Sequence, residues 1–130
     1  MASIRTETQI DASPERVWDA LRDWGALHER LAPGFVVDTR IEDGDRIVTF
    51  FNGAVVRERL VGLDEDSRRL AWSIADVYEH HNGSAQVLDD GNGGTLFVWT
   101  ADLLPDALAE PTRELMDRGA EAIKKQLESS

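Results

Sequence analysis

No cysteine occurs in this sequence of 130 residues. The chain therefore cannot form a disulfide, carry a thiolate nucleophile or bind zinc through thiolates. It has no apolar run near the roughly 20 residues that span a bilayer, and its N-terminus, MASIRTETQI, lacks the apolar segment of a signal peptide. We expect a cytoplasmic protein without membrane insertion, folded as a single domain over residues 1–130.

Positive charge is also scarce. The chain has 14 Lys and Arg residues against 25 Asp and Glu residues, which gives a formal net charge of −11. Nucleic acids and anionic membranes bind basic surfaces, so we expect neither as a partner. The sequence has no GxSxG motif, no phosphate-binding glycine loop and no dinucleotide fingerprint, which disfavours covalent serine chemistry and nucleotide binding. No cofactor is therefore expected.

The longest helical pattern is the C-terminal segment 105–127, PDALAEPTRELMDRGAEAIKKQL. Glu114 with Arg118 and Glu121 with Lys125 form favourable i,i+4 pairs on one face. A long helix after a run of strands predicts a sheet beneath it. The opposite face has apolar or small residues at spacings of three and four, the period of a helix with one buried side: Leu108, Leu115, Met116, Gly119, Ala120, Ile123 and Leu127.

Before that helix the pattern predicts one strand, two short helices and six further strands. Residues 3–10 alternate as a strand, and Ser13 and Pro14 then suit the N-cap and first position of a helix. This helix ends near Gly25, and a second covers 26–31. The later strands are expected over 35–42, 46–51, 54–63, 69–77, 84–88 and 95–103.

An Asn52-Gly53 pair predicts a tight hairpin between two of these strands. A two-residue loop would set Arg46 opposite Arg59 on the solvent face and turn Glu58 inward. A buried carboxylate costs several kcal/mol unless it is paired, hydrated or protonated. Glu58 is thus a candidate general acid or base. The alternative is that it bonds a buried water, a backbone amide or a cationic side chain for structural reasons.

A second candidate set consists of Asp76, Tyr78, His80 and Asn82, which are spaced two apart. In an extended strand they share a face, and an inward face would make them a polar rim at the mouth of a cavity. His80 suits proton transfer near neutral pH, so Glu58, Asp76 and His80 are the candidate catalytic residues. The alternative is an exposed connection, for which a turn-forming Asn-Gly pair is present.

Large side chains are candidates either for the core or for the walls of a cavity. Four Trp in 130 residues is a high count. A set of seven large side chains exceeds the needs of a small flat core, so some should face a ligand: Trp18, Trp72, Trp99, Phe35, Phe51, Phe97 and Met116. His80 and His81 are adjacent and would point to opposite faces of a strand, so no metal site is expected. The candidate ligand-binding residues are Trp18, Phe35, Phe51, Val56, Trp72, Tyr78, Asn82, Phe97, Trp99, Met116 and Gly119.

The order of elements, with D-A-S-P-E-R-V-W at 11–18 and V-V-R-E-R-L at 55–60, resembles the START-like (SRPBCC) superfamily. Within it the chain is similar to bacterial polyketide cyclase/dehydratase-type proteins and to Bet v 1-like and abscisic-acid-receptor-like proteins. The stretches at 80–87 and 99–106 resemble a bacterial subgroup. The resemblance covers residues 4–127. It implies an α+β helix-grip fold in which a seven-stranded curved antiparallel sheet, two short helices and the long C-terminal helix enclose an apolar cavity.

The resemblance also implies a function, namely binding of a small hydrophobic, lipid- or polyketide-like molecule between sheet and helix. Some members catalyse cyclisation or dehydration in the cavity, so the alternative is an enzyme using Glu58, Asp76 or His80. A third possibility is a protein-interaction or chaperone-like module that uses the sheet edge or loops, because one fold supports many functions. Nothing in the sequence favours a particular oligomeric state.

Overall fold

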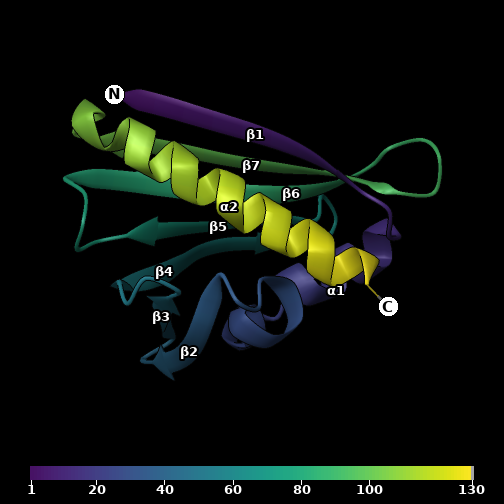
Figure 1. Ribbon diagram of the computed structural model, residues 1–130, viewed down its shortest axis with the longest axis horizontal. Coiled ribbons are helices and arrows are strands. Elements are labelled where there is room, and N and C mark those ends of the chain that lie inside the picture. Colours follow the sequence, from purple (N-terminus) through teal and green to yellow (C-terminus); the bar gives the residue numbers. More distant parts are fainter. Residues whose placement is uncertain (130) are drawn as a thin grey trace.

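The computed structural model describes residues 1–129, in which a seven-stranded antiparallel sheet curves around one long helix (Figure 1). This arrangement confirms the expected helix-grip fold. The strands lie in the order β1-β7-β6-β5-β4-β3-β2. Their bounds are β1 (Ala2–Ile10), β2 (Val36–Glu42), β3 (Asp45–Phe50), β4 (Val55–Asp64), β5 (Arg69–Ile74), β6 (His80–Asp89) and β7 (Thr95–Leu104).

The short helices follow β1, as the sequence predicts. α1 (Pro14–Leu21) begins with Pro14 in its first turn, and the Ser13 hydroxyl accepts a hydrogen bond from the Arg16 backbone N–H, which satisfies one of the free donors at the helix start. A short 3-10 turn, η1 (Trp24–Ala26), and one π-helical turn, η2 (Leu27–Leu31), then lead to β2. These elements close one end of the inner face of the sheet (Figure 1).

The long helix α2 (Ala109–Glu128) follows the turn η3 (Asp106–Leu108) and runs diagonally across the inner face of the sheet (Figure 1). Its exposed face carries the charged residues, whose hydration keeps that side in water. Within residues 1–129, no helix is both long and apolar enough to cross a membrane. The buried face of α2 consists of Thr112, Met116, Gly119, Ala120, Ile123 and Leu127.

The β3–β4 hairpin differs from its predicted register by one residue. Phe50 N–H donates to the Ala54 carbonyl at 2.8 Å, so the loop has three residues rather than two. Gly53 adopts a φ of 86°, the left-handed conformation that a three-residue hairpin loop requires. A shift of one residue reverses every side chain of β3. Arg46 therefore faces inward opposite Glu58, and the predicted Arg46–Arg59 pair is wrong.

The connection between β5 and β6 also differs from the prediction. β5 ends at Ile74 and the chain bends over residues 75–77. β6 begins at His80 rather than at residue 84. Because the bend interrupts the alternation of side chains, Asp76 and His80 are exposed while Tyr78 turns inward. Of the two alternatives considered for these four residues, the exposed connection holds for Asp76, His80 and Asn82, and the inward position holds only for Tyr78.

Candidate functional site

A cavity of about 100 Å³ lies between the inner face of the sheet and α2. Every strand except β1 contributes to its wall, together with α1, η2 and α2. A volume of roughly 10–15 Å³, on the scale of water-sized probes, holds one water, so this space exceeds that of a few waters. The space between the sheet and α2 is therefore not completely filled by side chains.

Most of the wall is apolar. Phe35, Trp72, Phe97, Trp99 and Met116, all predicted from the sequence, line the cavity. The rings of Trp72 and Trp99 lie 6.4 Å apart between centroids at an interplanar angle of 57°, a geometry typical of favourable aromatic pairs. Such side chains offer a ligand a large apolar contact area.

Gly119 lets α2 approach these rings closely. A Cβ atom at this position would lie 2.9 Å from the Trp99 ring and 3.0 Å from the Phe35 ring, closer than carbon atoms pack without strain. Glycine is unfavourable within a helix compared with alanine. Glycine is needed at this position despite its lower helix propensity, because a larger residue would prevent α2 from lying against Trp99 and Phe35.

Arg46 and Glu58 form the first polar spot in the wall. Arg46 Nε donates to Glu58 Oε1 at 2.7 Å, and the two side chains are only 5% and 7% exposed. Arg46 Nη1 also donates to the Trp24 carbonyl at 3.3 Å. The guanidinium carbon lies 3.8 Å from the centroid of the Trp24 ring, a cation–π geometry. Glu58 thus bonds a cationic side chain, the structural alternative expected for it.

Burial lowers the pKa of Arg46 from its ordinary value, while the charge and hydrogen bond of Glu58 oppose that shift. An arginine keeps its proton in proteins. The two opposite charges cancel at short range, so this part of the wall is polar but carries no net charge.

His81 forms the second polar spot. It lines the cavity and is 7% exposed. Its Nδ1 accepts a hydrogen bond from the Ile74 backbone N–H at 3.2 Å. Burial, with a smaller contribution from the neighbouring His80, lowers the pKa of His81 to about 4. The imidazole is therefore neutral at pH 7 with its proton on Nε2.

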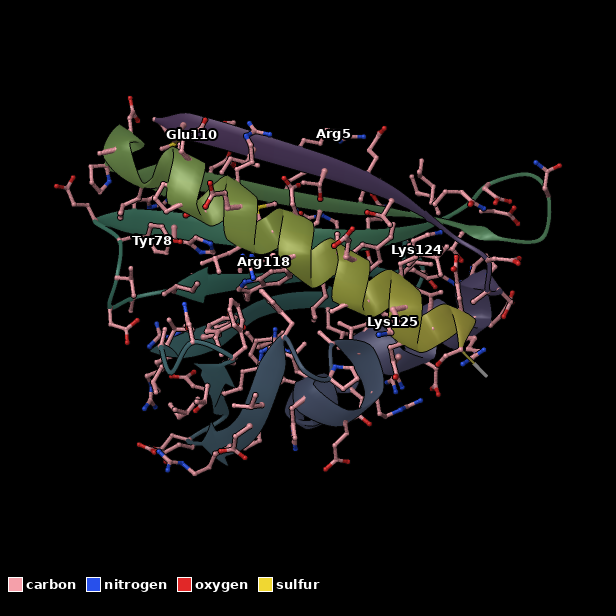
Figure 2. All side chains as sticks on the ribbon, in the orientation of Figure 1. Arg5, Tyr78, Glu110, Arg118, Lys124 and Lys125 are labelled. Atoms are coloured by element: carbon pink, nitrogen blue, oxygen red, sulfur yellow. The ribbon has the colours of Figure 1, made fainter. Side chains whose placement is uncertain are left out.

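Tyr78 and Thr112 join the sheet to α2 beside His81. The two hydroxyl oxygens lie 2.7 Å apart, and both residues line the cavity. The Tyr78 ring lies 4.9 Å from the His81 ring between centroids. Figure 2 shows Tyr78 at the end of the sheet near the first turns of α2. The end of the cavity near the start of α2 is therefore its polar end.

The two polar spots are separated across the sheet. Glu58 pairs with Ile74 on β5, and Ile74 bonds His81. Glu58 lies on β4 and His81 on β6, with β5 between them. A ligand between them would meet one polar group on each side of an apolar floor.

Four predicted ligand-binding residues do not line the cavity: Trp18, Phe51, Val56 and Asn82. Trp18 and Val56 are buried in the core but do not line the cavity. Phe51 is 43% exposed, because it belongs to the hairpin loop rather than to β3, and its ring lies 5.2 Å from the guanidinium carbon of Arg118 on α2. Figure 2 labels Arg118 in the middle of the helix.

His80 and Asn82 lie on the exposed outer face of β6. His80 Nε2 lies 2.8 Å from Asn82 Oδ1, and the Asn82 amide donates to Asp102. Hydrogen bonds from Ser3 and Asn82 lower the pKa of Asp102. Asp76 is exposed in the bend after β5. Two of the three candidate catalytic residues, Asp76 and His80, therefore lie outside the cavity.

Sequence reasoning missed Arg46, Phe50, His81 and Thr112 as wall residues. For Arg46 and Phe50 the only available signal was the alternative three-residue reading of the hairpin. Thr112 occupies the buried stripe of α2 at i−4 from Met116, so the helical period could have identified it. His81 could not be assigned without knowing where β6 begins. Among residues 1–129 no cluster of three or more His, Asp or Glu side chains could hold a metal ion.

Comparison with known proteins places the chain in a family context. A family model described as polyketide cyclase / dehydrase and lipid transport matches residues 1–129. No curated protein has a sequence that matches significantly. Among solved structures, XoxI from Bacillus cereus has a TM-score of 0.87 at 19% identity, covering 98% of this chain and 96% of that chain.

Two further structures are similar. A norcoclaurine synthase point mutant from Thalictrum flavum, in complex with a transition state analogue, has a TM-score of 0.72 at 18% identity, covering 97% of this chain and 93% of that one. The structure of Ara h 8.0201 has a TM-score of 0.77 at 16% identity and covers 99% of both chains. Likeness at this level of identity shows the fold alone.

Proposed function

The chain belongs to the polyketide cyclase / dehydrase and lipid transport family, and we propose that it binds a small hydrophobic molecule in the cavity between its sheet and α2. The single observation that carries this proposal is the apolar cavity of about 100 Å³ with two separate polar spots in its wall. Ligand sites are commonly apolar hollows with a few fixed polar groups.

The size of the cavity limits the ligand. A cavity of about 150 Å³ in another protein accommodates benzene, so the space of about 100 Å³ suits a molecule near the size of one aromatic ring. A longer ligand requires outward movement of a wall side chain. Trp99 and Leu115 are partly exposed wall residues.

The arrangement of polar groups supports binding rather than acid–base catalysis. Glu58 is the one predicted catalytic residue in the wall, and Arg46 occupies its Oε1. His81 uses Nδ1 to accept from Ile74, so its remaining nitrogen is a donor and not a base.

Native mass spectrometry of the purified protein tests the proposal. We expect a co-purified small molecule that is released on denaturation and is retained by Glu58→Gln, which preserves shape and an acceptor for Arg46. The enzyme alternative predicts turnover of a polyketide-like substrate that collapses in Glu58→Gln while the fold survives. An empty protein that also fails to bind any added aromatic probe would rule out the binding function.

A further inference from the structure

His81 carries the one neutral imidazole of the cavity wall, and its two nitrogens have different roles. Nδ1 accepts from the Ile74 backbone N–H. Among residues 1–129, Nε2 has no hydrogen-bond partner. Because Nδ1 is occupied as an acceptor, the proton of the neutral ring must be on Nε2. The wall therefore contains an N–H donor that the protein itself does not satisfy.

The ring of His81 is held in place by its neighbours. The Tyr78 ring lies against it at 4.9 Å between centroids. On the same strand, a Cβ at Gly83 would lie 3.2 Å from His81 Cε1 and 3.0 Å from the Trp72 ring. Glycine at this position therefore leaves the space that both rings occupy. A donor fixed in this way loses little entropy when it bonds a ligand.

The rest of the wall indicates what charge the ligand carries. Arg46 and Glu58 neutralise each other at 2.7 Å, and the low pKa of His81, about 4, keeps its ring uncharged at pH 7. A carboxylate in this cavity would lose its hydration without meeting an unpaired positive charge, which is costly. A neutral acceptor such as a carbonyl oxygen loses much less.

We propose that the cavity selects neutral ring-sized molecules bearing a carbonyl or similar acceptor, which the Nε2–H of His81 recognises. This inference rests on the proposed binding function and specifies its ligand class. A hydrocarbon ligand would leave the Nε2–H of His81 without a hydrogen-bond acceptor. An anion would find no unpaired positive charge in the wall. His81 is thus a specificity-determining residue of the cavity.

Three probes of one shape test the inference: acetophenone, α-methylstyrene, which replaces the carbonyl oxygen with a methylene, and the benzoate anion. Dissociation constants at pH 7 come from titrations followed by amide resonances of wall residues. We expect acetophenone to bind about two- to tenfold more tightly than α-methylstyrene, the factor that one hydrogen bond supplies. Benzoate should bind more weakly than acetophenone.

Two variants test whether His81 causes the preference for acetophenone over α-methylstyrene. His81→Leu should bind both neutral probes equally, whereas His80→Leu, which changes the exposed neighbour, should keep the preference for acetophenone. A second readout does not depend on the variant folding: the ¹⁵N resonances of His81 in the wild-type protein should show the Nε2–H tautomer, and Nε2 should shift with acetophenone but not with α-methylstyrene.

The outcomes separate this inference from the proposed function. If no probe perturbs the wall resonances, the binding function fails and the inference falls with it. If the probes bind but acetophenone and α-methylstyrene bind equally, or benzoate binds best, the cavity binds ligands and the selectivity assigned to His81 is wrong. A preference for acetophenone that persists in His81→Leu also overturns the inference.

Discussion

Arg46 and Glu58 are an ion pair with almost no contact with solvent, 5% and 7% exposed. Removing one partner of such a pair leaves a buried charge, whereas removing both leaves an apolar wall. Arg46→Leu and Glu58→Leu should each lower the free energy of unfolding by about 3–5 kcal/mol. Arg46→Leu/Glu58→Leu should lower it by less than either single change, as measured by urea denaturation.

Additive losses in the double variant would show that the two side chains act independently. Arg57 and Asp45 provide the matched control on the same two strands, since their 2.7 Å pair is partly exposed. Exposed pairs contribute about 0–1 kcal/mol, so Arg57→Leu should cost far less than Arg46→Leu.

His81 makes the stability of the fold depend on pH. Its pKa is about 4 in the folded chain against 6.5 for an unperturbed histidine, so the unfolded chain takes up this proton first as the pH falls. The stabilisation from the neutral ring is complete above the unfolded pKa and is lost as the pH falls toward the folded pKa. The free energy of unfolding should therefore decrease below pH 6.5, by at most about 1.4 kcal/mol per pH unit.

This pH effect can be assigned by comparing denaturation curves of wild type, His81→Gln and His80→Gln between pH 7 and pH 5. The decrease should be smaller in His81→Gln and unchanged in His80→Gln. Equal pH dependence in wild type and His81→Gln would contradict the burial of a neutral ring at this position.

At the scale of elements, α2 depends on a glycine in its buried face. Replacing Gly by Ala in an ordinary helix stabilises it by about 1 kcal/mol. At Gly119 the added Cβ would lie 2.9 Å from Trp99 and 3.0 Å from Phe35, and overpacking costs about 1–3 kcal/mol. Gly119→Ala should therefore lower the free energy of unfolding by about 1 kcal/mol instead of raising it.

The intrinsic preference of α2 can be measured at an exposed position of the same helix. Because Glu121 is exposed, the difference in stability between Glu121→Ala and Glu121→Gly in thermal denaturation gives the stabilisation expected from helix propensity alone. A gain at Gly119→Ala equal to that difference would show that Trp99 and Phe35 move away freely.

Sequence patterns predicted α2 and β7 correctly but not the β3–β4 hairpin. The helical period of 105–127 identified the buried face of α2, and Phe97 and Trp99 were correctly predicted to line the cavity. The prediction for the β3–β4 hairpin failed because Asn52-Gly53 fits both a two-residue and a three-residue loop. Gly53 is left-handed in both, and only the two-residue type I′ loop also needs a positive φ at Asn52, which Asn52 does not adopt. Because the predicted register was wrong by one residue, Arg46 was placed on the solvent face and was not recognised as the partner of Glu58.

The polar end of the cavity was predicted only through Tyr78, for a different reason. Alternation assigns faces only while a strand is continuous, and β5 stops at Ile74. The bend over 75–77 changes which of Tyr78, His80 and His81 faces inward. Local sequence does not fix that bend, because Tyr78 is held by Thr112, 34 residues away on α2.

The whole molecule keeps a void that a structural core would fill. At roughly 24 cal/mol per Å³, the cavity of about 100 Å³ corresponds to on the order of 2 kcal/mol of forgone stability. Ala101 lines this cavity, so the added methyl groups of a valine would enter it. Ala101→Val should raise the free energy of unfolding by about 0.5–2 kcal/mol, the usual gain from filling a cavity.

The same substitution should reduce the affinity for acetophenone by at least tenfold, on the order of 1.4 kcal/mol, because two added methyl groups occupy the ligand's space. Ala71→Val on the outer side of β5 tests the effect of a β-branched residue alone and should leave affinity unchanged. Stability that rises while affinity falls would show that the void is maintained at the expense of stability for binding. If Ala101→Val stabilises the fold and acetophenone binds as before, the ligand lies elsewhere and the cavity is only a packing defect.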